Sequence, residues 1–236
     1  MIDLNKCELI ATRVANLLST VTGVEEGTPM VHVLENGKSV VKPATGAANE
    51  KYAGCALGRP TTPTLAVYVD NLLVPASGAY TVTLTKTMSG SDIKVVSVAA
   101  GGARTTLAAG SASNAGEYSI SNGVITVNSS KASTTLEVTY KYAITLQEAI
   151  MKYRFDGFSP INNAANIGTQ GLIMTGRVYT SMFDITKDWH SITGAVPVTL
   201  GAGVYTIGGS GTTLDMFVEE VPSAANNGML GLRVQP

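Results

Sequence analysis

Charged side chains are scarce in this chain. Only 14% of its 236 residues are charged, and the 16 lysines and arginines nearly balance the 17 aspartates and glutamates. A chain without surplus positive charge lacks the field that draws a protein to nucleic acid or to an anionic membrane surface. We therefore expect neither nucleic acid nor a membrane among its partners.

Histidine and cysteine are rarer still. The two histidines, His32 and His190, are too few for a metal site built mainly from imidazoles. The two cysteines, Cys7 and Cys55, are a poor framework for a disulfide-dependent secreted domain, so we expect free thiols. The composition predicts no cofactor and no resident metal.

Long apolar runs are also missing. No segment approaches the roughly 20 apolar residues that a membrane-spanning helix needs. The N-terminal MIDLNKCELIATRV lacks the basic region and unbroken apolar run of a signal peptide, so we expect a protein made in a cytoplasm. The hydrophobic content of 44% is nevertheless enough to build a core from short segments.

Two Asn-Gly pairs lie between β-rich runs, at Asn36-Gly37 and at Asn122-Gly123. Both central residues of a type I′ turn need positive φ, which asparagine and glycine tolerate best. The sequence therefore predicts two hairpins, one joining strands 30–34 and 39–41 and one joining strands 118–120 and 124–127.

Further strands are expected from the alternation of apolar and polar residues. The clearest of them is 136–142, where apolar residues alternate with polar neighbours. This pattern predicts a strand with one buried and one solvent-exposed face; the apolar residues are Leu136, Val138, Tyr140 and Tyr142. The other expected strands are 65–69, 80–85, 93–98, 172–179, 196–200, 204–207 and 214–221.

One short helix is expected after the last strand of the middle segment. The residues Thr145-Leu146-Gln147-Glu148 fit a capping box, in which a threonine hydroxyl and a glutamate carboxylate satisfy free amides at a helix start. The helix is expected to end near Arg154. The overall prediction is a mainly β fold with at most one short helix.

A proline-containing turn and a helix start flank the middle segment of the chain. Arg59-Pro60-Thr61-Thr62-Pro63 precedes it and the helix start follows it. Residues 64–144 are thus expected to form an inserted, Ig-like β-sandwich. The host domain would be discontinuous, formed by 1–63 plus 145–236, and β-barrel or jelly-roll-like.

The two ends of the chain carry apolar residues. Residues 1–28 show a mixed pattern compatible with a helix or an extended arm, whereas 229–236 alternates in the manner of a strand. Each end is either an ordinary sheet edge or an arm that contacts a neighbouring subunit. The candidate contact residues are Ile2, Leu4, Leu9, Ile10, Leu230, Leu232 and Val234.

Motifs for chemistry are weak. Gly37-Lys38-Ser39 lacks the earlier glycine of a phosphate loop, and Gly201-Ala202-Gly203 is followed by an expected strand instead of a helix. The most site-like cluster is Asp184, Asp188 and His190, which would surround a cation if the chain brought them together. We favour a packed turn around Trp189 instead, and no enzymatic activity is predicted.

Three features together resemble the decoration, or cement, proteins of tailed bacteriophage capsids. They are the hairpin segment VHVLENGKSV at 31–40, the inserted module that ends in GEYSISNGVITV and LEVTYKYAIT, and a tail of short strands. The resemblance implies a protein, often trimeric, that docks on the outside of the expanded head and ties major capsid subunits together. It implies synthesis in the bacterial host's cytoplasm, a final location on the virion surface, and no catalytic residue.

Three alternatives stay open. One is another virion part, such as a tail or head-fibre subunit, which the same β-module would serve. Another is a carbohydrate-binding module in which Trp189 and Tyr205 stack on sugars; the inserted module of a decoration protein would also be placed to touch host-surface glycans. The third is an enzyme whose carboxylates meet only in three dimensions.

Overall fold

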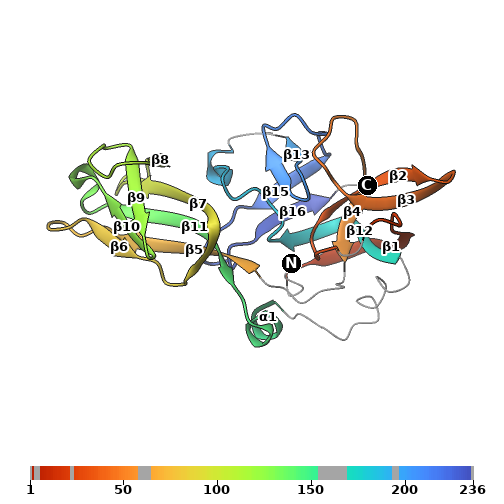
Figure 1. Cartoon of the computed structure of the whole chain (residues 1–236), viewed down its shortest axis with the longest axis horizontal. Coiled ribbons are helices and arrows are strands. Elements are labelled where there is room, and N and C mark those ends of the chain that lie inside the picture. The colour runs from red at the N-terminus through yellow and green to blue at the C-terminus, as the bar shows by residue number, and fades with distance from the viewer. Residues whose placement is uncertain are drawn as a thin grey trace. The chain divides into compact units, whose positions relative to one another are not determined.

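A computed structural model describes residues 2, 6–21, 24–57, 65–153, 169–192 and 197–234 (Figure 1). The described chain is mainly β with one short α-helix, as the sequence predicts. It divides into two compact units. Unit 1 comprises Met1–Thr64, Ile144–Pro222 and Met229–Pro236, and unit 2 comprises Leu65–Ala143 and Ser223–Gly228.

Unit 1 is built on a seven-stranded sheet. The strands follow the order β15-β16-β12-β4-β2-β3, and β1 also pairs with β12. A two-stranded sheet, β13-β14, belongs to the same unit. The strands are β1 (Glu8–Asn16), β2 (Pro29–Glu35), β3 (Lys38–Pro43), β4 (Lys51–Leu57), β12 (Thr169–Thr180), β13 (Val198–Leu200), β14 (Tyr205–Ile207), β15 (Met216–Glu220) and β16 (Leu230–Val234).

The sheet of unit 1 curls into a half-barrel because the end of β1 reaches β3. Leu17 forms a parallel bridge with Val41, and the amide of Leu18 donates a hydrogen bond of 2.9 Å to the Val41 carbonyl. The curl encloses one cluster of buried side chains, whose sequestration from water stabilises the unit. The cluster consists of Leu17, Val24, Met30, Val41, Ala53, Ala56 and Leu172.

A second group of buried aromatic side chains lies in unit 1. The rings of Phe183 and Trp189 meet edge to face with centroids 5.8 Å apart. The phenol oxygens of Tyr52 and Tyr205 lie 3.0 Å apart, so each buried hydroxyl has a hydrogen-bonding partner. These contacts fix the 3-10 turn Trp189–Ser191 and strand β14 in the fold.

Unit 2 contains the other seven-stranded sheet, in the order β5-β11-β7-β8-β9-β10-β6. All neighbours are antiparallel except β8 and β9, which pair in parallel over two residues of each strand. The strands, which Figure 1 labels, are β5 (Leu65–Leu73), β6 (Thr81–Thr83), β7 (Met88–Val98), β8 (Arg104–Ala109), β9 (Glu117–Ser121), β10 (Val124–Val127) and β11 (Thr135–Ala143), with a 3-10 turn at Ser129–Lys131.

The alternation predicted for 136–142 is confirmed. Leu136, Val138, Tyr140 and Tyr142 are all buried, and the residues between them are less so. Because successive side chains of a strand point to opposite faces, this pattern gives β11 one face in the core of unit 2.

Both predicted hairpins are also confirmed. Asn36 and Gly37 have φ of 51° and 76°, and Asn122 and Gly123 have φ of 49° and 76°. The turns join β2 to β3 and β9 to β10 in antiparallel register. The backbone conformation is the one that the Asn-Gly pairs predict.

The single helix, α1 (Leu146–Tyr153), begins where the sequence predicts. The hydroxyl of Thr145 accepts a hydrogen bond of 3.1 Å from the amide of Glu148, which satisfies one of the free amides of the first turn. The expected end at Arg154 lies outside the described residues.

Several elements differ from the sequence-based expectation. The segment Glu8–Asn16 is a strand, which is the sheet alternative left open for the N-terminus, whereas β4 and β8 were not predicted. The middle unit spans Leu65–Ala143, against the expected 64–144, and it also includes Ser223–Gly228. The glycine at 228 explains this addition: a Cβ there would lie 2.8 Å from the carbonyl oxygen of Val67, so only glycine lets the segment pack on β5.

Candidate interaction surface

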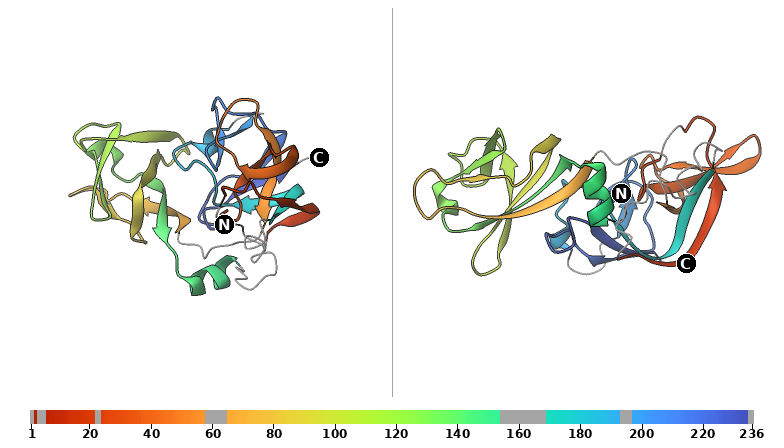
Figure 2. Two further views of the ribbon diagram at one scale, coloured as in Figure 1. Left: turned by 45° about the vertical axis from the view of Figure 1, so that its right-hand side comes forward. Right: turned by 90° about the horizontal axis from the view of Figure 1, so that it is seen from below.

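Strand β1 is an edge strand of unit 1. Among the described residues, β1 is paired with β12 along its length, and it also approaches β3, to which the chain is bridged just after the end of β1. Figure 2 shows β1, in red, running beside β12, in teal. Val14 is 67% exposed and Leu9 is 45% exposed, so the strand presents apolar side chains as well as an edge.

An edge strand has unpaired backbone groups that another strand can bind. With one antiparallel neighbour, only alternate residues of β1 use their amide and carbonyl groups in the ladder. Two register irregularities interrupt the pairing, one between Leu9 and Ala11 and one between Ala11 and Thr12. Irregularities of this kind discourage indiscriminate pairing. The regular part, Thr12–Asn16, is therefore the best place for an added strand.

A balanced row of charges crosses the sheet next to β1. Glu8 on β1 pairs in register with Arg177 on β12, and Arg177 pairs in turn with Arg233 on β16. The carboxylate of Glu219 binds both arginines, with its Oε2 2.5 Å from Nε of Arg177 and its Oε1 bound to Nε of Arg233. Nη2 of Arg233 lies 3.7 Å from the Glu8 carboxylate.

The environment of Glu219 favours its charged form. Burial by itself would raise the pKa of Glu219, but hydrogen bonds from Arg233 and Arg177, together with their positive charges, lower it below its ordinary value. At neutral pH the ion pairs of Glu219 with Arg177 and Arg233 therefore hold the row together. Phe217, directly across from Arg233, is 53% exposed beside this row.

The candidate contact residues of the two termini have different positions. Leu4 lies outside the described residues, and Ile10 belongs to β1 without a described side chain. Leu9 is exposed on β1, as a contact residue must be. Ile2, Leu230, Leu232 and Val234 are buried instead, because Ile2 bridges to Thr180 and β16 lies between β12 and β15.

Of the two alternatives for the C-terminus, residues 230–234 take the sheet position, as strand β16. The alternating apolar residues of 230–234 bury themselves against neighbouring strands of their own unit, so as the chain is folded they offer no surface to another subunit. Sequence reasoning did not select Val14, Leu34 and Phe217, which are the most exposed large apolar residues on the described strands of unit 1. No local signal marks them, because exposure on a strand depends on which neighbours the topology supplies.

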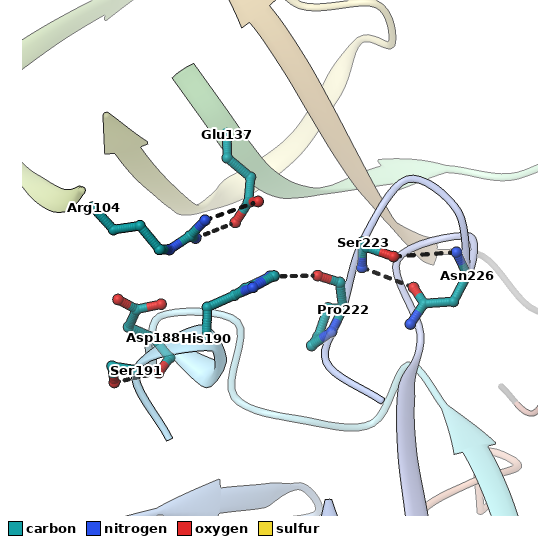
Figure 3. Close-up of polar contacts among 8 residues, drawn as sticks. All are labelled: Arg104, Glu137, Asp188, His190, Ser191, Pro222, Ser223 and Asn226. Carbon is teal, nitrogen blue, oxygen red and sulfur yellow. Dashed lines mark hydrogen bonds and ion pairs between the residues drawn. The ribbon is translucent and has the colours of Figure 1, made fainter. Parts of the chain in front are cut away.

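The cluster of Asp184, Asp188 and His190 is a packed turn. Asp184 accepts hydrogen bonds from the amide and hydroxyl of Thr186, and its backbone carbonyl accepts one of 2.9 Å from the indole of Trp189. His190 Nε2 lies 3.0 Å from the carbonyl oxygen of Pro222, toward which it points in Figure 3. Within the described ranges, no three His, Cys, Asp or Glu side chains gather where they would hold a metal ion.

Other polar pairs drawn in Figure 3 are structural. Arg104 and Glu137 of unit 2 form a two-pronged ion pair, with Nη2 to Oε1 at 2.6 Å and Nη1 to Oε2 at 3.4 Å. Ser223 and Asn226 exchange hydrogen bonds of 2.8 and 3.3 Å, which hold their turn. Each of these side chains is therefore hydrogen-bonded to a partner within unit 2.

Two residues considered for sugar stacking are inaccessible. Trp189 and Tyr205 are buried in unit 1. The Trp189 indole and the Tyr205 hydroxyl each form a hydrogen bond inside the unit. A ring must expose a face to stack on a carbohydrate. The stacking platform expected for a carbohydrate-binding module is therefore not formed by this pair.

Helices long and apolar enough to cross a bilayer are not found in the part of the chain that the structure describes. Comparison with known proteins adds no relative: no family model, no curated protein and no solved structure matches this chain.

Proposed function

We propose that the chain is a virion structural protein that decorates the outer surface of a tailed-phage capsid and stabilises it by bridging major capsid subunits. The proposal starts from the resemblance in the sequence, and the open edge of β1 is the observation that carries it furthest. A protein that binds others through a sheet edge needs accessible backbone groups for hydrogen bonds and exposed apolar side chains for contact. Strand β1 supplies both through Thr12–Asn16, Leu9 and Val14.

The finer architecture is part of the proposal. Unit 1 serves as a discontinuous, barrel-like host domain that binds the capsid, and unit 2 is an inserted sandwich of the Ig-like class. The half-barrel closed at Leu17 and Val41 supports the first statement. The buried face of β11 and the meeting of two antiparallel strand groups at β8 and β9 support the second.

Such a protein works by mass action. It binds the assembled lattice and not the dissociated capsid subunits, so its binding free energy adds to the stability of the shell. Weak contacts suffice when one molecule bridges two neighbours, because the second contact forms at a high effective concentration. A trimer of the chain would multiply this advantage, and we propose that state for the bound form.

The role requires no reacting group. A tail or head-fibre subunit would use the same β-modules. The position of the chain on the parent particle separates these two roles, since a decoration protein follows the capsid lattice and a fibre subunit does not.

The test uses expanded capsids assembled without this chain. Purified chain is added, and co-sedimentation and the capsids' melting temperature are measured. We expect saturable binding and a higher melting temperature. Val14→Asp should weaken binding, because it places a charge on the β1 edge, whereas Leu73→Asp should not, because Leu73 is an equally open strand residue of unit 2 (69% exposed). Capsids that neither bind the chain nor gain stability would rule out the proposed role.

A further inference from the structure

Basic side chains from three strands of unit 1 meet at the margin of the half-barrel core. Nη2 of Arg13 on β1 lies 2.6 Å from Nε2 of His32 on β2. Lys51 on β4 is the register partner of His32, so its side chain leaves the sheet beside the imidazole. On the other side, Nδ1 of His32 lies 3.1 Å from the hydroxyl of Ser39 on β3.

The positive charges of this group are uncompensated. Among the described residues, neither Arg13 nor Lys51 forms an ion pair with a carboxylate. The two glutamates nearest in sequence to His32 and Lys51 bind other groups. Glu35 accepts hydrogen bonds from the amide and hydroxyl of Ser19, and Glu50 accepts them from the amides of Thr45 and Gly46.

The guanidinium of Arg13 is partly withdrawn from water. Its Nε is buried and has no hydrogen-bonding partner in the described part of the chain, and its Nη2 contacts a neutral acceptor. A guanidinium that gives up hydration normally gains a carboxylate or phosphate in return. Among the described residues, the partner of the Arg13 guanidinium is the imidazole of His32.

The pKa of His32 is lowered by its position in this group. Burial is the main cause that lowers the pKa of His32, and the charges of Arg13 and Lys51 lower it further. At neutral pH the imidazole is therefore uncharged, accepts the hydrogen bond from Arg13 at Nε2 and donates from Nδ1 to Ser39. An anion placed among these groups would oppose both charges and make protonation of the ring easier.

An apolar side chain adjoins the group. Leu34 follows His32 by two residues on β2, so both side chains leave the same face of the strand. Leu34 is 79% exposed, close to the turn of the hairpin. A partner that carries an acidic side chain next to an apolar one would match this arrangement of charge and surface.

We propose that Arg13, His32 and Lys51 form a receptor for a carboxylate, supplied by an acidic loop of the capsid subunit that the chain decorates. Leu34 packs against an apolar residue of the same loop. This inference rests on the proposed decoration role and names the chemistry of its partner. The reason is charge complementarity, since two cations without a carboxylate and a neutral imidazole lie together in a chain with a net charge of −1.

The first experiment needs no capsid. The pKa of His32 is measured by NMR titration of its ring protons in sodium chloride and in sodium sulfate at equal ionic strength. Sulfate serves as the probe for an oxyanion. We expect sulfate to raise the pKa of His32, and the ring signals of His190 in the same spectra serve as a reference for the added salt. In Lys51→Gln, the effect of sulfate on His32 should shrink.

The second experiment measures affinity for expanded capsids. Lys51 is an exposed residue at the start of β4, so Lys51→Gln should fold normally. We expect it to bind capsids about two- to five-fold more weakly, as for the loss of an exposed ion pair. Lys38→Gln is the matched control, because it removes the same charge from the exposed turn of the β2–β3 hairpin. Its affinity should stay at the wild-type value.

The outcomes separate the two proposals. A His32 pKa that does not respond to sulfate would overturn the anion receptor, whatever the capsid result. A response to sulfate combined with equal capsid affinity of Lys51→Gln and Lys38→Gln would overturn the capsid carboxylate as occupant while leaving the decoration role intact. Wild-type chain that fails to bind capsids would instead overturn the decoration role.

Discussion

The hydroxyl of Tyr140 on β11 donates a hydrogen bond of 2.8 Å to the carboxylate of Asp70 on β5, inside unit 2. The same carboxylate accepts hydrogen bonds from the amide and hydroxyl of Thr85, at 2.9 and 2.6 Å. The Tyr140 oxygen also accepts one of 3.0 Å from the amide of Lys86. These hydrogen bonds connect Thr85 and Lys86, in the segment after β6, to the paired strands β5 and β11.

Removing the Tyr140 hydroxyl should destabilise unit 2. Tyr140→Phe deletes a hydrogen bond to a charged acceptor and leaves the amide of Lys86 without a partner, which costs about 1.5–3 kcal/mol. Chemical denaturation monitored by NMR signals of unit 2 measures the loss. Tyr118→Phe is the control, since Tyr118 is also buried in unit 2 but its hydroxyl forms no hydrogen bond within the described residues. Equal losses in the two variants would refute the role given to this network.

The two cysteines should differ strongly in reactivity. Burial is the main cause that raises the pKa of the Cys55 thiol to about 12, whereas Cys7 is only half-buried. At pH 8 only about one Cys55 thiol in ten thousand would be ionised even if reagent could reach it. Alkylation followed by mass spectrometry should label Cys7 in the folded chain and Cys55 only after unfolding. Comparable native labelling rates would contradict the buried position of Cys55.

Local rules predicted those parts of the fold in which neighbours in sequence decide the conformation. The Asn-Gly pairs fixed two hairpins because their residues accept positive φ, and Thr145 marked the start of α1 because its hydroxyl can cap an amide. Alternation located β11 because its two faces meet different surroundings. In each case the physical cause lies within a few residues of the effect.

The remaining elements depend on partners far away in the chain. Strand β4 is rich in alanine, glycine and cysteine, and it is a strand because Gly54 lets it approach the backbone of Ile173 closely. Likewise, the sequence of 230–234 alternates as a strand does, and only its position between β12 and β15 decides between a strand of the sheet and an arm. The open edge of β1 follows from the same long-range pairing, so no local pattern revealed it.

The glycine at 228 should be irreplaceable for the packing of Ser223–Gly228 on β5. Its φ is +72°, and a Cβ would lie 2.8 Å from the backbone oxygen of Val67. Gly78 has φ of +95° and open space around it, so Gly78→Ala reports the conformational cost alone, about 1 kcal/mol. Gly228→Ala should cost about 1–3 kcal/mol more, from the steric conflict.

Hydrogen exchange of the Val67 and Tyr68 amides, together with global unfolding, measures this difference. We expect faster exchange there in Gly228→Ala and native-like exchange in Gly78→Ala. If the two alanine variants have the same stability, the close approach of Gly228 to Val67 does not constrain the fold.

The charge row beside β1 should make unit 1 less stable in acid. The pKa of Glu219 is lower in the folded chain than its ordinary value, so folding favours the charged form. The resulting stability is present above the unfolded pKa of about 4.5 and is lost as the pH falls through the lower folded pKa. Glu219→Gln should therefore be less stable than wild type at neutral pH, and the gap should close in acid.

Urea unfolding at a series of pH values measures that gap. Asp215→Asn is the matched control, because Asp215 is exposed and forms no ion pair among the described residues. A stability gap for Glu219→Gln that is independent of pH would contradict the electrostatic role of Glu219.

Amide hydrogen exchange of β1, in free chain and in chain bound to expanded capsids, tests the central claim most directly. With one neighbouring strand, the amides of Thr12–Asn16 that do not face β12 have no backbone partner in the described fold and should exchange rapidly in free chain. Capsid binding through this edge predicts that they become slow. Unchanged exchange in 12–16 on saturated capsids would contradict the claim that the β1 edge binds the lattice.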